Sequence, residues 1–275
     1  MVLQYVISGA LVGLVVGATG VGGGSLMTPL LTLVFGVPAQ VAVGTDLLFA
    51  SITKSGGAWT YARHGQVRWP IVYWLALGSV PASCLTLAAV QQLHLDSVQF
   101  NALLRPILGL ALLLTAAALA FRTQIQVLGA RAIANAAPAL VGNANSACLA
   151  ASGTDRALRP APTLALGALI GVLVTLTSVG AGAIGVVALF FLYPSLVARQ
   201  LVAADIAHAV PLTLIAGLGH AALGTVDWAM LLALLLGSLP AIHLGARLSG
   251  RLPERVLRVL LASMLLLIGL RLLWI

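Results

Sequence analysis

The sequence predicts an all-α polytopic membrane protein, built from two inverted repeats whose helices are broken and partly re-entrant at glycine-rich turns. Three observations lead to this prediction: an apolar composition, a similarity between the two halves of the chain, and basic loops that change sides between them. Of the 275 residues, 61% are hydrophobic and only 7% are charged, and the mean hydropathy is +1.10. Since a soluble domain carries roughly a quarter charged residues, the composition excludes an ordinary water-soluble protein.

The net charge of +8 comes from arginines that cluster in short loops between apolar segments. This distribution is typical of membrane topology, so nucleic acid is not expected as a partner. The N-terminal stretch has no basic region and no cleavage site of small residues, and we interpret it as a retained first segment. Cys84 and Cys148 lie in no metal-ligand spacing, so we expect neither a disulfide framework nor a metal or other cofactor.

Each half of the chain contains five apolar segments, which define the expected elements. They are 3–19, 25–36, 39–60, 70–90 and 98–121 in the first half, and 163–178, 183–193, 197–219, 228–247 and 254–274 in the second. The second segment of each half is too short to cross about 30 Å of hydrocarbon, because twelve helical residues rise only about 18 Å. We therefore expect the first two segments of each half to form a broken hairpin that turns at a glycine cluster.

The two halves resemble each other at an offset of 159 residues. The motif LALGSVPA at 75–82 corresponds to LLLGSLPA at 234–241, and Asp46 corresponds to Asp205. A tandem repeat is the simplest explanation. It divides the chain into a first membrane repeat at 1–121, a cytoplasmic linker at 122–162 and a second, inverted membrane repeat at 163–275.

Arginines occupy opposite loops in the two halves. The loop at 61–69 carries two arginines and its counterpart at 220–227 carries none, whereas 91–97 has no basic residue and its counterpart at 247–258 has four arginines. The positive-inside rule then inverts the second half relative to the first and puts both termini outside. Inverted repeats with interrupted helices are typical of secondary transporters, because mirrored halves open alternately around one site.

The stretch GATGVGGGSL at 17–26 places four glycines within five positions. A chain that reverses there and begins a helix at Ser25 leaves N–H groups without intrahelical partners, and these donors form an anion site together with the positive end of the helix dipole. The second half has a corresponding helix start near Gly182. The alternative is that the glycines only permit tight helix packing. The candidate substrate-binding residues are Gly22, Gly23, Gly24, Ser25, Thr45, Lys54, Ser178, Gly180 and Gly182.

Several motifs together, GVGGGSLMTPLL at the first turn, AVGTDLL at 42–48, YARHGQVRW at 61–69 and GSVPA at 78–82, resemble the sulfite exporter TauE/SafE family, also called TSUP permeases. The resemblance covers nearly the whole chain outside the linker. It implies a multi-pass carrier of the bacterial inner membrane for sulfur-containing anions such as sulfite, sulfonates or sulfoacetate, coupled to protons and without ATP hydrolysis. The second half departs from the glycine motif, with Ser178 and Ala181 where the first has Gly20 and Gly23.

Asp46 and Asp205 each lie about eight residues into a segment, roughly 12 Å deep. We expect both to line one central space, where a carboxylate takes up and releases a proton, and His208 lies three residues after Asp205. Asp46, Asp205 and His208 are therefore candidates for proton coupling. The alternative is that each aspartate only accepts hydrogen bonds from the broken-helix backbone. Lys54 either contacts the anion or, more simply, extends to the cytoplasmic interface.

The leading hypothesis is thus a secondary carrier whose partners are a small anion and the lipid bilayer, with a homodimer left open. A cation or metal carrier, or a channel, would instead use Asp46 and Asp205 to bind a positive ion. An intramembrane enzyme would need a nucleophile with a base, or paired metal ligands, and no such set is recognisable. Residues near segment ends are interpreted as interfacial; they are His220, His243, Arg105 and Arg271.

Overall fold

The protein is described by a computed structural model, in which every regular element of the described residues is a helix. The described residues are 2–19, 26–92, 104–120, 158–180, 182–194, 196–248 and 254–274, with the single positions 99 and 102. The all-α prediction is confirmed. The first glycine cluster and most of the linker lie outside the described residues.

The helices match the predicted apolar segments to within three residues, apart from the helix at Leu104–Ala120, before which several positions are not described. The first half contains α1 (Val2–Thr19), α2 (Met27–Leu33), α3 (Ala39–Arg63), α4 (Trp69–Gln92) and the helix Leu104–Ala120. The second half contains α7 (Pro160–Thr177), α8 (Ala183–Leu192), α9 (Ala198–Ala222), α10 (Trp228–Leu248) and α11 (Glu254–Trp274).

Among the described residues, four helices are long and apolar enough to cross a membrane; they are Trp69–Gln92, Pro160–Thr177, Arg199–Ala222 and Trp228–Gly245. By contrast, α2 has 7 residues and α8 has 10. At 1.5 Å per residue these two rise only about 10 and 15 Å, so the prediction of a short second helix in each half is confirmed.

The long helices α3 and α9 end in the same way. Gly65 and Gly224 lie two residues beyond the last helical residue, with φ of 65° and 73°. This left-handed conformation terminates a helix and is readily adopted by glycine, which has no Cβ. The next helix begins four residues later, at Trp69 and at Trp228. The repeated motifs GQVRW and GTVDW are therefore the connections between two consecutive helices.

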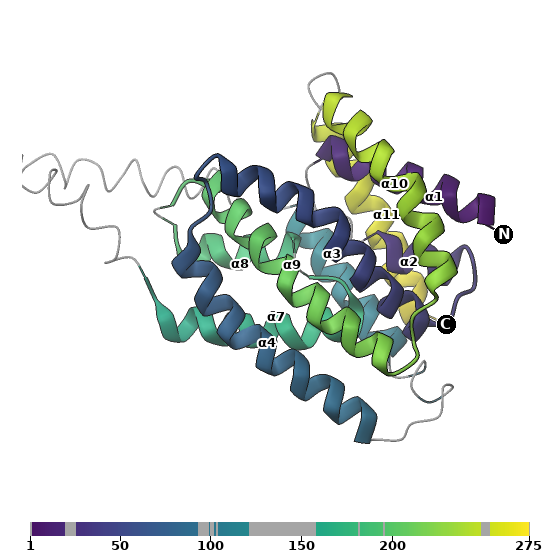
Figure 1. The fold of residues 1–275 in the computed structure, drawn as a ribbon, viewed down its shortest axis with the longest axis horizontal. Coiled ribbons are helices and arrows are strands. Elements are labelled where there is room, and N and C mark those ends of the chain that lie inside the picture. Colours follow the sequence, from purple (N-terminus) through teal and green to yellow (C-terminus); the bar gives the residue numbers. More distant parts are fainter. Residues whose placement is uncertain are drawn as a thin grey trace, which may run out of the picture.

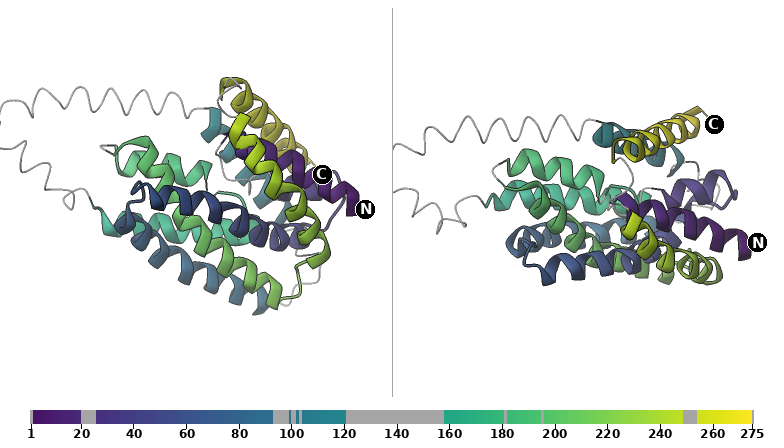
Figure 2. Two further views of the ribbon diagram at one scale, coloured as in Figure 1. Left: turned by 45° about the horizontal axis from the view of Figure 1, so that its top comes forward. Right: turned by 90° about the horizontal axis from the view of Figure 1, so that it is seen from above.

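Helices of one half pack mainly against helices of the other. The largest contacts are those of α1 with α10, of α4 with α7, and of α3 with α9 (Figure 1). Figure 2 shows the helix Leu104–Ala120 beside α11, and Gly269 of α11 lies close to the backbone of Gly109. Leu108 and Leu112 of this pair join one apolar core with Met27 of α2.

Close glycine contacts recur in two of the helix pairs that join the halves, α1 with α10 and α4 with α7. A Cβ at Gly9 of α1 would meet the backbone of Leu234, and a Cβ at Gly167 of α7 would meet the backbone of the repeat-matched Leu75. Small residues let membrane helices approach in this way. Two further matched sets are Gly13 against Ser238 with Gly171 against Ser79, and Gly237 against Val6 with Gly78 against Leu164. These contacts agree with the repeat found in the sequence.

Contacts between segment ends agree with the predicted membrane sides. The Arg68 Nε–H donates to Oε1 of Gln200 at 3.3 Å, and both ends are predicted to be cytoplasmic. At the other end of the molecule the Asp227 N–H donates to Oγ1 of Thr45 at 3.1 Å. Asp227 belongs to a loop that is predicted to lie outside, and Thr45 belongs to the half of α3 that begins on that side. The inversion itself stays a prediction.

The inversion is tested by the labelling of single cysteines in a background without Cys84 and Cys148. Cysteines in place of Gln66 and Gln92 should react with a membrane-impermeant thiol reagent from opposite faces, as should those in place of Thr225 and Ser249. The positive-inside rule puts Gln66 and Ser249 on the cytoplasmic face. Labelling of positions 66 and 225 from one face would contradict the inverted repeat.

The crossed packing of α7 on α4 is tested at Gly171. The side chain of Gly171→Val would meet the carbonyl oxygen of Ser79, so overpacking should destabilise the fold by about 1–3 kcal/mol. The midpoint of thermal unfolding in detergent is the measurement. Gly56→Ala is the control, because nothing lies within 4 Å of a Cβ at that helical position. Equal midpoints for the two variants would show that the close contact is wrong.

Candidate functional site

Four ionisable side chains are buried together in the two central helices. Asp46 and Lys54 come from α3, and Asp205 and His208 come from α9. We call these four residues the charge cluster. Only Lys54 has measurable exposure, 5%, and the other three have none. Ionisable groups are costly inside a membrane protein and mark functional sites, so the cluster is the candidate site.

The register between α3 and α9 fixes the heights of these side chains. Gly217 of α9 packs against Leu48 of α3, and a Cβ at Gly57 of α3 would lie 3.9 Å from Cγ2 of Ile206. A higher number in α3 thus pairs with a lower number in α9, and the helices are antiparallel. These two contacts show which residue of α9 lies opposite each residue of α3.

The two aspartates therefore lie at different levels. At 1.5 Å per residue, Asp46 and Asp205 are about 20 Å apart along the helix axes. Lys54 lies between these levels and interacts electrostatically with both carboxylates, more strongly with Asp205. Two levels are thus linked by one lysine, because each aspartate is near the start of its own helix. That both aspartates line one central space stays a prediction.

Asp46 is bound by the first turn of α2. Its Oδ2 accepts hydrogen bonds from the Thr28 N–H at 3.2 Å and from the Thr28 hydroxyl at 2.5 Å. The hydroxyl of Ser178 approaches the same carboxylate without meeting hydrogen-bond geometry, and Oδ1 of Asp46 has no partner in the described part of the chain. Asp46 thus stabilises a broken-helix terminus, as the alternative interpretation expected.

Asp205 has no comparable donors. Neither of its carboxylate oxygens has a hydrogen-bond partner among the described residues. The carboxylate packs against the first turn of α8, where a Cβ at Gly185 would overlap its Oδ1. The first turn of α8 carries no hydroxyl group, unlike that of α2. The repeat-matched aspartates therefore differ in chemistry, and of the two only Asp205 has no hydrogen-bond partner at either oxygen among the described residues.

His208 bonds to α4 and not to Asp205. Its Nε2 lies 2.7 Å from Oγ of Ser79, and its Nδ1 has no hydrogen-bond partner within the described ranges. Ser79 was not among the predicted site residues. The only feature of the sequence that could have pointed to Ser79 is its repeat-matched counterpart, Ser238. Both serines are fully buried.

The turn between α7 and α8 shows how the second half breaks its helix. Ser178 has φ of 57°, Gly180 of 122° and Gly182 of 132°. Glycine adopts such angles readily, whereas Ser178 does so at a cost. Gly182 precedes the first residue of α8 and gives it no side-chain cap. The predicted helix start near Gly182 is confirmed.

The remaining predicted substrate residues fall into two groups. Thr45 is fully buried, but its hydroxyl oxygen accepts the Asp227 N–H of the loop before α10. The hydroxyl therefore ties that loop to α3. The residues of the first glycine turn lie outside the described residues; they are Gly22, Gly23, Gly24 and Ser25.

Two side chains for which an interfacial position was expected or left open, those of His220 and Lys54, are buried. Lys54 does not extend to the surface, because its helix packs on α9 along this face. His220 is 3% exposed, with Nε2 3.0 Å from the carbonyl oxygen of Thr175 and Nδ1 2.9 Å from Oγ1 of Thr225. It joins the end of α7 to the loop after α9. Burial of these side chains depends on tertiary contacts that segment position alone does not give.

In the part of the chain that the structure describes, no group of three or more His, Cys, Asp or Glu side chains is placed to hold a metal ion. In addition, the Lys54 ammonium group already supplies a positive charge to both aspartates.

The contact between Thr28 and Asp46 predicts a stability effect. Thr28→Val removes the hydroxyl donor and leaves a buried carboxylate with one donor fewer, which should cost about 1–3 kcal/mol. The midpoint of thermal unfolding in detergent measures this. Thr213→Val is the control, since that buried hydroxyl donates only to the carbonyl oxygens of Ala209 and Val210 in its own helix. A smaller loss in Thr28→Val than in the control would contradict the assignment.

Comparison with known proteins gives the same class of protein. The sequence model of the family described as Sulfite exporter TauE/SafE matches residues 5–272. The probable membrane transporter protein YjnA of Bacillus subtilis (strain 168) is 34% identical over an alignment of 284 positions, which covers 99% of this chain and 100% of the relative. The probable membrane transporter protein YdhB of the same organism is 25% identical over 248 residues, 90% of each chain. No solved structure matches this chain. The protein is therefore a multi-pass membrane transporter that belongs to the sulfite exporter TauE/SafE family.

Proposed function

We propose that this protein carries a small sulfur-containing anion across the bacterial inner membrane together with a proton, as a secondary transporter. The single observation that supports the coupling is the buried Lys54 beside two aspartates, of which Asp205 has no hydrogen-bond donor among the described residues. Sulfite as a substrate is supported by the description of the family. The extension of the substrate class to sulfonates and sulfoacetate is what the resemblance of the sequence motifs to this family implies.

The charges of the cluster explain why an anion and a proton would move together. One ammonium group faces two carboxylates, so the cluster is negative when both carboxylates are ionised and His208 is neutral. One added proton makes it neutral and a second makes it positive. Since an anion in a low-dielectric interior is strongly repelled by negative charge, protonation of the cluster favours anion binding.

The two aspartates are proposed to have different roles. Oδ2 of Asp46 is occupied by the two donors of Thr28. Asp205 lies one helical turn from His208 and close enough to Lys54 to interact electrostatically with it. Asp205 is therefore the proposed proton carrier, with His208 as its neighbour and Asp46 as a structural carboxylate at the other level.

Lys54 and the broken helices are proposed to bind the anion. Lys54 supplies the positive charge, and the start of α8 supplies backbone N–H groups at the positive end of a helix dipole. Gly180 and Gly182 allow the chain to turn there, and Ser178 brings a buried hydroxyl group without a hydrogen-bond partner in the described chain. The first glycine turn, Gly22 to Ser25, has the corresponding role in the other half.

The proposal is tested by anion uptake into proteoliposomes with and without a pH gradient. Sulfite, sulfate, thiosulfate, taurine and sulfoacetate are the probes. Asp205→Asn should abolish accumulation above equilibrium yet keep anion binding, because the amide has the size and hydrogen-bonding capacity of the carboxyl group but cannot titrate. Asp46→Asn is the repeat-matched control and should retain gradient-driven accumulation.

Equilibrium binding in detergent tests anion binding separately from proton coupling. Lys54→Met should weaken anion binding by about 10- to 150-fold, which corresponds to the 1.5–3 kcal/mol of a hydrogen bond to a charged group. Unchanged gradient-driven accumulation by Asp205→Asn would reject that residue as the proton carrier. Loss of binding together with transport in the same variant would instead make Asp205 part of the anion site.

A further inference from the structure

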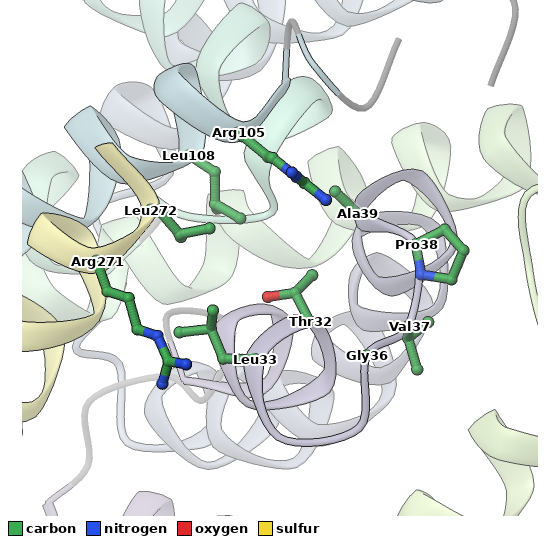
Figure 3. A pocket seen from close by; sticks show the side chains of 10 residues that line it. All are labelled: Thr32, Leu33, Gly36, Val37, Pro38, Ala39, Arg105, Leu108, Arg271 and Leu272. Carbon is green, nitrogen blue, oxygen red and sulfur yellow. The ribbon is translucent and has the colours of Figure 1, made fainter. Parts of the chain in front are cut away.

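A pocket away from the charge cluster has two arginines on its walls. It has a volume of about 370 Å³ and lies between α2, the start of α3, the helix Leu104–Ala120 and α11. Figure 3 shows Arg105 and Arg271 on two sides of this pocket, each extending from its own helix toward the α2–α3 segment. Both arginines are exposed, as their interpretation as interfacial residues expected.

The positive charge of this pocket is not balanced by the described residues that line it. No aspartate or glutamate lines it, and neither arginine has a hydrogen-bond or ion-pair partner in the described part of the chain. The hydroxyl of Thr32 donates within its own helix, to the carbonyl oxygens of Thr28 and Pro29 at 3.1 Å. The other walls include Leu33, Leu108 and Leu272. Two guanidinium groups line one partly apolar space, so an anion that enters this space is attracted by both.

The shape of the guanidinium group indicates which anion fits. Its N–H donors form a planar fork that binds two oxygens of one group, as in arginine–phosphate pairs. The pocket volume is at the lower end of the range of about 300–1,000 Å³ that is usual for small-molecule sites. A compact tetrahedral oxyanion with a short apolar part matches both the arginines and the leucines.

The place of the pocket agrees with such a ligand. The start of α3, the start of the helix Leu104–Ala120 and the end of α11 all belong to the predicted outer side of the membrane. Phosphate groups of lipids and soluble anions are both available at that face. The pocket is also close to the site described above, because Thr32 lies one turn after Thr28, which binds Asp46.

We propose that Arg105 and Arg271 form a second anion-binding site, which holds the tetrahedral oxyanion group of a soluble sulfate or sulfonate or of an anionic phospholipid. The site is separate from the charge cluster. It requires neither the proposed proton coupling nor the proposed substrate, so it stands or falls on binding alone.

A cysteine on the pocket wall reports on occupancy of this site. Val37→Cys is introduced in a background with Cys84→Ser and Cys148→Ser, and its modification by a neutral thiol reagent is timed in detergent. A bound ligand should slow modification by about tenfold when its concentration is ten times Kd. The probes are sodium sulfate, sodium methanesulfonate and short-chain phosphatidylglycerol, compared with sodium chloride at equal ionic strength and with short-chain phosphatidylcholine.

The arginines are tested by replacing both of them. Arg105→Gln with Arg271→Gln should abolish the protection, whereas Arg63→Gln, at an exposed arginine in the last turn of α3, should leave it unchanged. If the double glutamine variant does not fold, Arg105→Lys with Arg271→Lys replaces it. Lysine keeps the charge but lacks the planar fork, so protection should then be weaker.

The outcomes distinguish the sources of the anion. Protection by sulfate or methanesulfonate supports the site with a soluble ligand, and protection by phosphatidylglycerol alone supports it with a lipid headgroup. No protection by any of these anions, or equal protection in the double arginine variant, would overturn the proposal. Neither result bears on uptake by the proteoliposomes, so the transport proposal is tested independently.

Discussion

The structure depends on one constraint: charges that are buried inside a membrane protein must be compensated by other groups of the same protein. Lys54, Asp46 and Asp205 lie on the two helices that pack along each other at the centre, so the compensating charges are on neighbouring surfaces. The crossed pairs of α1 with α10 and of α4 with α7 place the other helices of both halves around this centre. The short helices α2 and α8 have the complementary role. The first turn of α2 donates two hydrogen bonds to Asp46, and the first turn of α8 packs against Asp205 through Gly185. An uninterrupted helix, with its N–H groups bonded internally, would not offer the Thr28 N–H to a carboxylate.

The repeat preserves backbone geometry more closely than chemistry. Helix ends, glycine contacts and the positions of the aspartates are matched between the halves, as Gly65 and Gly224 illustrate. The surroundings of the matched aspartates are not. Thr28 gives Asp46 two hydrogen bonds, whereas Gly185 leaves Asp205 with a contact and no donor from the described chain. The two matched halves thus hold one carboxylate that accepts hydrogen bonds and one that has no donor among the described residues.

The helices were predictable because long apolar segments bounded by glycine, proline and arginine have few other solutions in a bilayer. Their partners were not, because the packing of α1 on α10 depends on which small residues meet in space. The burial of Lys54 was missed for the same reason: sequence position places it near a helix end, and only the register of α3 on α9 covers it. Thr28 and Ser79 carry no local signal that links them to Asp46 and His208, since hydroxyl side chains are common in membrane helices. The first glycine turn, which began the argument for an anion site, stays a prediction.

The single buried lysine also explains why the two halves cannot be identical in their polar residues. The counterpart of Lys54 is Thr213, which is fully buried and donates to Ala209 of its own helix at 2.8 Å. Because the two aspartates lie on opposite sides of Lys54 along the α3–α9 pair, one ammonium group interacts with both. A second lysine at 213 would add an ammonium group inside the same low-dielectric interior, where like charges repel strongly. One cation shared by two carboxylates leaves a single uncompensated negative charge, and one proton is enough to neutralise it. The departure from symmetry at this position therefore sets the charge of the site.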